Sequence, residues 1–126
     1  MAIKYEQVTL TISGSAGSAT GSAKSRPIMG RLLAVHLDYT SQPATADVTI
    51  ATAGAGCPAL TLLTVSNNAT DGWYFPRKAV HTDTGAAVTY NGTQVVAEPA
   101  PITDAVVVSV AQGDPGSLVA TLVFEE

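Results

Sequence analysis

The chain has 126 residues, a length that fits a single domain. Only 13% of its residues are charged, about half the usual share, and ten acidic against six basic residues give a net charge of −4. This balance argues against a groove that neutralises nucleic-acid phosphates, and so neutral a surface leads us to expect a partner subunit that covers part of it.

Cysteine content and hydropathy exclude further classes of protein. Cys57 is the only cysteine, so neither an internal disulfide nor a thiolate metal cluster forms within one chain. The N-terminal stretch MAIKYEQVTL lacks the apolar core of a signal peptide, and we expect a protein made and kept in a cytoplasm. Residues 48–70 carry no charge, but Gly, Pro and Asn interrupt them well before the ~20 apolar residues of a membrane helix, so no membrane partner is expected.

The first predicted elements are a strand and a loop. Val8, Leu10 and Ile12 alternate with polar residues, which is typical of a strand with one buried face. The segment from Gly14 to Pro27 then contains only small and polar residues besides two basic ones, with nothing large enough to anchor a core. It is predicted to be a flexible low-complexity loop or arm.

Three further strands are predicted in the middle of the chain. In residues 31–40, Leu33, Val35, Leu37 and Tyr39 alternate with Leu32, Ala34, His36 and Asp38, so each set occupies one face of a strand. Pro43 ends this strand, residues 46–52 supply the next, and residues 59–66 follow after a Gly-rich turn.

The C-terminal half adds turn signals. Asn91-Gly92 predicts a two-residue hairpin turn within residues 88–95, and the prolines of residues 98–101 predict an extended link. Residues 105–112 and 117–126 flank Gly113-Asp-Pro-Gly116, which predicts that they pair as an antiparallel hairpin. With no helical pattern anywhere, the sequence predicts a single-domain, all-β fold, an antiparallel β-sandwich or jelly-roll-like barrel.

Metal binding rests on two similar tripeptides. His36 and Asp38, and likewise His81 and Asp83, are two residues apart, so in a strand each histidine lies beside its own aspartate. If the pairs met across a sheet they would offer ligands for zinc or another divalent ion, whereas an ordinary hydrogen bond is the alternative for each pair.

No catalytic centre is predicted. The sequence has no G-x-S-x-G elbow and no Gly-rich loop that ends in Lys-Ser or Lys-Thr, and Cys57 lies in no nucleophile motif. No motif singles out two of the ten acidic residues as a catalytic pair for glycoside cleavage. We therefore expect a protein without enzymatic activity and without a cofactor.

The segment DGWYFPRKAVHTDTGAA, residues 71–87, concentrates aromatic and basic side chains. It contains Trp73, Tyr74, Phe75, Pro76, Arg77 and Lys78 in succession. Three interpretations remain open: a stacking platform for sugars, an interface anchor rich in the residues that dominate binding hot spots, or a core plug with a cationic rim.

Five blocks carry a family resemblance: residues 30–39 (GRLLAVHLDY), 46–50 (ADVTI), 67–77 (NNATDGWYFPR), 80–88 (VHTDTGAAV) and 104–113 (DAVVVSVAQG). In this order they resemble small head proteins of tailed bacteriophages, of the kind encoded near the major capsid protein and assigned as decoration or cement subunits. The resemblance begins at Gly30, so the segment 14–27 lies outside it.

The resemblance implies a subunit that binds the major capsid protein on the outside of the shell, as a symmetric dimer or trimer, and stabilises it. Its place would be the capsid surface of the virion. Trp73 to Lys78 would be an anchor to the shell or a sister subunit, and the segment around Lys24 and Arg26 a second contact. The alternative is a carbohydrate-binding β-sandwich of a phage tail or fibre that uses the same aromatic residues.

Overall fold

The computed structural model describes residues 1–126 and contains strands, turns and loops but no helix, hence no helix able to span a membrane. Its ten strands are β1 (Ile3–Ile12), β2 (Ala19–Pro27), β3 (Gly30–Asp38), β4 (Asp47–Thr52), β5 (Thr61–Val65), β6 (Gly72–Tyr74), β7 (Arg77–Ala79), β8 (Ala97–Ile102), β9 (Ala105–Gly113) and β10 (Gly116–Glu125).

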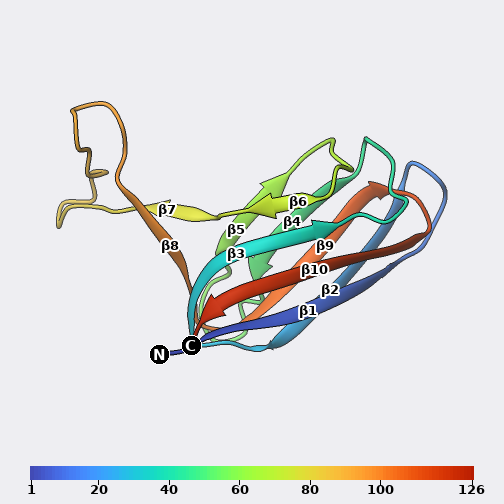
Figure 1. The fold of residues 1–126 in the computed structure, drawn as a ribbon, viewed down its shortest axis with the longest axis horizontal. Helices are drawn as coiled ribbons and strands as arrows, with labels where there is room; N and C mark the ends of the chain where they lie inside the picture. The colour runs from blue at the N-terminus through green and yellow to red at the C-terminus, as the bar shows by residue number, and fades with distance from the viewer.

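The strands form two antiparallel sheets that pack face to face (Figure 1). The first has the order β1-β10-β3-β8-β7, with β6 paired to β3 as well, and the second has the order β2-β9-β4-β5. The prediction of an antiparallel β-sandwich is therefore confirmed. β9 lies between β2 and β4, so residues 105–108 belong to a central strand of its sheet.

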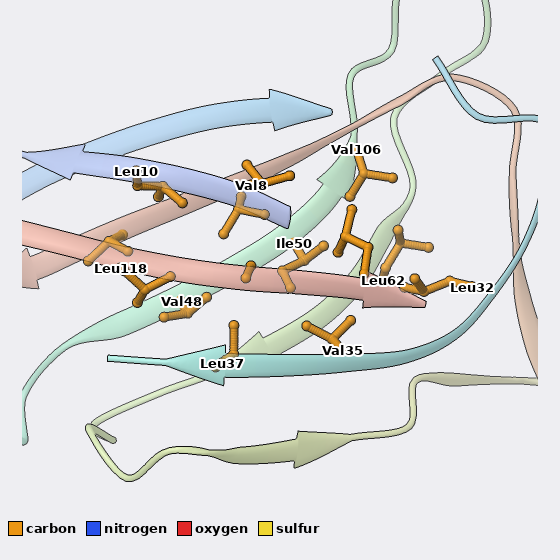
Figure 2. Packing of buried hydrophobic residues seen from close by; sticks show 14 of the residues in the cluster. Val8, Leu10, Leu32, Val35, Leu37, Val48, Ile50, Leu62, Val106 and Leu118 are labelled. Carbon is orange, nitrogen blue, oxygen red and sulfur yellow. The ribbon is translucent and has the colours of Figure 1, made fainter. Parts of the chain in front are cut away.

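The core fills the space between the sheets with aliphatic side chains (Figure 2). Leu10, Leu37 and Leu118 from the first sheet meet Val48 and Ile50 from the second, and all are buried. The period-two alternation along each strand predicts these positions, because alternate residues point to opposite faces. Each such side chain contributes roughly 1.5–3 kcal/mol through removal of its apolar surface from water.

The predicted hairpin of the last two strands is wrong. β9 pairs with β2 and β4, whereas β10 pairs with β1 and β3, so the turn at 113–116 carries the chain from one sheet to the other. Gln42 holds this connection: its Nε2 donates to the Asp114 carbonyl at 3.1 Å, and its Oε1 accepts from the Asp114 N–H at 3.0 Å. Gln112 has a φ of 53° there, which bends the chain out of its sheet.

The predicted flexible arm at residues 14–27 is also wrong. Ala19–Pro27 is the edge strand β2, paired with β9 despite its small side chains, and only residues 14–18 form a turn. Position 21 requires glycine, because a Cβ there would lie 2.5 Å from the carbonyl oxygen of Thr11 on β1. Small residues thus allow β1 and β2 to approach closely where the two sheets meet.

A bulge shifts the predicted faces of β3. Phe124 is opposite Leu32 and Val123 is opposite Ala34, so Leu33 is an extra residue in β3. Leu32 therefore points inward together with Val35 and Leu37, while Leu33 is only half-buried. The predicted division of residues 31–39 into two alternating faces therefore fails at Leu32 and Leu33, because the bulge puts Leu32 on the face of Val35 and Leu37.

A β arm, residues 76–99, extends away from the sandwich on the left of Figure 1. β7 pairs with residues 97–99 of β8, whose remaining residues pair with the start of β3. At the tip, Val80 N–H donates to Val96 O, Val96 N–H to Val88 O and Val88 N–H to Val80 O, which closes a ring of three hydrogen bonds. The hairpin expected around Asn91-Gly92 lies in this tip, with a loop of three residues instead of two.

Candidate interaction surface

The outward side of the first sheet carries large apolar side chains, and we call it the aromatic face. Its members are Ile3, Tyr5, Trp73, Val119 and Val123, and we add the exposed Phe75, which follows β6 two residues after Trp73. Tyr5 is directly opposite Val123, and one row further Gln7, Thr121, His36 and Trp73 follow each other across four strands. Ile3, Tyr5, Trp73 and Phe75 are 71%, 75%, 56% and 61% exposed. Water therefore contacts four large apolar side chains on one side of the molecule.

The outward side of the second sheet has the opposite character, and we call it the hydroxyl face. Ser22, Ser109, Thr49 and Thr64 are direct neighbours across all four strands. All four belong to the outward set that alternates with the core residues. Since one sandwich presents both faces, the exposed aromatic groups of the first sheet are not a general property of this chain's surface.

Trp73 is held at the edge of the aromatic face by β3. Its Cα is paired with that of His36, and the two rings meet edge to face with centroids 5.0 Å apart and an interplanar angle of 63°. The contact covers one side of the indole and leaves most of it exposed. The arrangement suits an aromatic side chain presented in a fixed orientation to a partner.

The other residues of the 73–78 segment have different positions. Tyr74 points inward against the core and accepts a hydrogen bond from Asn68 Nδ2 at 2.7 Å, and Pro76 is buried. Arg77 Nη1 donates to the Leu33 carbonyl at 3.0 Å, at the point where the edge of β3 changes partner from β8 to β6. Arg77 thus fixes the base of the arm, and Lys78 lies on β7 opposite Glu98.

The two basic residues of the 14–27 segment also differ. Lys24 lies on β2 and is exposed. Arg26 forms ion pairs with Glu126 at 2.9 Å and with Glu6 at 3.6 Å, and its guanidinium lies 5.4 Å from the centre of the Phe124 ring. The hydrogen bond from Arg26 lowers the pKa of the Glu126 carboxyl to about 2. Arg26 therefore ties β2 to the last strand of the other sheet.

The two His-Asp pairs do not come together. His36 and Asp38 lie on β3, where His36 contacts Trp73 and the Asp38 carboxylate accepts the Thr40 N–H at 3.0 Å. His81 and Asp83 lie in the tip of the arm, where His81 is bridged to Ala87. No group of three or more His, Cys, Asp or Glu side chains in the structure is placed to hold a metal ion.

The surface also holds no pocket. The chain exposes 6652 Å², a few hundred Å² more than the roughly 6,300 Å² expected for a compact monomer of this mass. Its distinctive surface features are therefore a flat apolar side and a projecting arm.

Comparison with protein-family models, with the curated proteins and with the solved structures finds no match to this chain.

Sequence reasoning missed the part that the first strand plays in the aromatic face. Ile3 and Tyr5 have odd numbers, whereas the core residues Val8, Leu10 and Ile12 have even ones. The same alternation that placed the core therefore places both side chains outside it, and two large apolar residues on the outer side of a strand were the available signal.

Proposed function

We propose that this chain is a non-enzymatic structural subunit that decorates and stabilises the outside of a bacteriophage capsid. The observation that carries the proposal is the contrast between the two outer sides of the sandwich. One outer side presents the exposed side chains of Ile3, Tyr5 and Trp73, whereas the other has a row of hydroxyl side chains and, next to it, Lys24, Val107 and Ala51, with no large aromatic group. A concentration of exposed large apolar side chains on one side of a small protein is typical of a site that another protein covers.

The size of the aromatic face indicates that the arm takes part in the contact. Four strands about 4.8 Å apart and at most ten residues long, at about 3.3 Å per residue, give no more than about 600 Å². A stable interface buries roughly 800 Å² on each partner. The arm supplies the missing area, and repetition over a shell allows each single contact to be weak. The capsid as the partner comes from the resemblance of residues 30–113 to phage decoration proteins.

Binding to isolated shells tests the attachment surface. We expect Trp73→Ala combined with Phe75→Ala to abolish co-sedimentation with expanded shells that lack the subunit. Thr49→Ala combined with Thr64→Ala, on the hydroxyl face, is the matched control and should bind like the wild type. Arg77 is left unchanged because its loss would disturb the arm as well. Equal binding by both double variants would remove the aromatic face from the proposal.

Copy number in purified particles tests the function independently of the surface. Hundreds of copies in a fixed ratio to the main shell protein are expected of a decoration subunit. A handful of copies, together with a change of Trp73 fluorescence on adding oligosaccharides, would favour the carbohydrate-binding tail module instead, since Trp73 is the only tryptophan and is exposed. Absence from particles would refute both.

A further inference from the structure

We propose that the tip of the arm is a site of spontaneous covalent modification, at which Asn91 converts to aspartate and isoaspartate through a succinimide ring. In this reaction the main-chain nitrogen of Gly92 attacks Cγ of Asn91 and forms a C–N bond. The Cγ–Nδ2 bond breaks, and Nδ2 leaves as ammonia with the proton of the Gly92 nitrogen. Water then opens the ring at either carbonyl. The only co-reactant is water, and the proposal does not depend on the proposed function.

The electrophile is polarised by the loop. Asn91 Oδ1 accepts the N–H of Thr93 at 3.0 Å and that of Gln94 at 2.7 Å. Two main-chain donors aimed at one carbonyl oxygen stabilise the negative charge that develops on it when a nucleophile adds to the carbon. On the other side, Nδ2 donates to Gln94 Oε1 at 3.1 Å, so the hydrogen bonds fix which end of the amide faces the donors.

The nucleophile is free. The Gly92 N–H donates to no group in the protein, so no hydrogen bond must break before the nitrogen loses its proton. Gly92 has a φ of 82°, and a Cβ built on it would have no atom within 4 Å. Asn91, Gly92 and Thr93 are all exposed, which gives hydroxide and water access to the ring. Glycine also places no side chain beside the attacking nitrogen.

The two other asparagines provide internal comparisons. Asn68 makes a similar turn, with Oδ1 accepting the Thr70 N–H at 2.9 Å, but it has one donor instead of two, is half-buried and precedes Ala69. Asn67 precedes Asn68, whose N–H donates to the Ala46 carbonyl at 3.1 Å and is therefore not free. Only Asn91 combines a free nitrogen, a following glycine and two donors on its carbonyl.

Peptide mapping by mass spectrometry tests the proposal on the full chain. After incubation at neutral pH and at one pH unit higher, the peptide with Asn91 should gain one mass unit and contain isoaspartate. Its rate should exceed those at Asn67 and Asn68 by about tenfold or more, because a hindered or hydrogen-bonded nucleophile and a less polarised carbonyl slow the other two sites. The rate should also increase with hydroxide concentration. Conversion at Asn67 or Asn68 as fast as at Asn91 would overturn the assignment.

The same measurement in urea isolates the contribution of the folded loop. We expect Asn91 to react at least as fast in the folded protein as in the unfolded chain, whereas folding should protect Asn67 and Asn68. Asn91→Gln should abolish the mass gain, because its longer side chain cannot close the five-membered ring, and should remove the more acidic band that isoelectric focusing resolves. A reaction at Asn91 that is slower in the folded protein than in urea would show that the loop protects the amide and would overturn the proposal.

Discussion

Tyr39 illustrates, at the scale of a residue, a polar group for which the fold has no partner. The side chain is 1% exposed, and its hydroxyl, although near that of Tyr74, makes no hydrogen bond of acceptable geometry. Burial, with a smaller contribution from the neighbouring Tyr74, raises the pKa of this phenol well above its ordinary value. Tyr74 differs because its own hydroxyl accepts a hydrogen bond from Asn68. We therefore expect the loss of the hydroxyl to have opposite effects on stability at the two tyrosines.

Tyr39→Phe should stabilise the protein by about 1 kcal/mol, because it removes a buried hydroxyl whose loss of water nothing compensates. Tyr74→Phe should destabilise it by about the same amount, because Asn68 Nδ2 loses its acceptor. Urea unfolding of both variants measures the two changes. A Tyr39→Phe variant as destabilised as Tyr74→Phe would mean that the Tyr39 hydroxyl is hydrogen-bonded after all.

At the scale of the element, the alternation in the sequence predicts which side chains of a strand are buried but not which strands are neighbours. The positions of Val8, Leu10 and Ile12 follow from alternation, because it is a local property of the chain. The turn between β9 and β10 is held instead by Gln42, about 70 residues away in sequence, and such a distant contact gives no local signal. The positive φ of Gln112 gives no sequence signal either, since glutamine is not a turn residue.

The same distinction applies to the candidate surface. The composition of the segment 73–78 is enough to select it. The alternation of a strand also predicts that Trp73 and Phe75 lie on one side and Tyr74 on the other, and their exposure agrees. The role of Arg77 could not be predicted, because it depends on the place where β3 changes partners.

Gln42→Ala tests the connection between the sheets. We expect a loss of about 2 kcal/mol in unfolding free energy, because two hydrogen bonds vanish and leave main-chain groups of Asp114 without partners. Gln7→Ala is the control, since Gln7 is exposed and makes a single long hydrogen bond, and it should change stability very little. Similar losses in the two variants, measured by urea unfolding, would contradict this role of Gln42.

At the scale of the whole molecule, the charges are unevenly distributed. Asp38, Asp47, Asp71 and Asp114 lie at the end of the sandwich opposite the arm, and each accepts a main-chain N–H there. The six remaining acidic residues and all six basic residues belong to the other half of the sandwich and the arm, where their charges sum to zero. The net charge of −4 thus resides at one end, and the chain has a marked electrical polarity.

The ion pairs of Glu126, at the end of the sandwich near the arm, lead us to expect that stability depends on pH. The pKa of Glu126 is about 2 in the folded protein against an ordinary value of 4.5, so its stabilising effect is complete above pH 4.5 and is lost as the pH falls from there toward 2. Asp104, whose pKa the N–H groups of Ala55 and Ala105 lower, adds a loss in acid that every variant with Asp104 shares.

Glu126→Gln should therefore be less stable than the wild type near neutral pH, with the difference closing between pH 4.5 and 2. Glu98→Gln is the control because Glu98 makes no ion pair. Urea unfolding over this pH range gives the comparison. A difference between Glu126→Gln and the wild type that stays constant down to pH 2 would show that Arg26 does not act through this carboxylate.

The pairing of β1 with β10 has a consequence for how the protein is made. β1 has β10 as its only sheet partner, and β10 is also the strand that joins β1 to β3. A ribosome releases β1 first of the ten strands and β10 last, so the first sheet remains in two parts until translation has passed residue 125. Until then β1 lacks its only sheet partner, and its unpaired main chain and apolar side chains, among them Val8 and Leu10, are open to association with other chains.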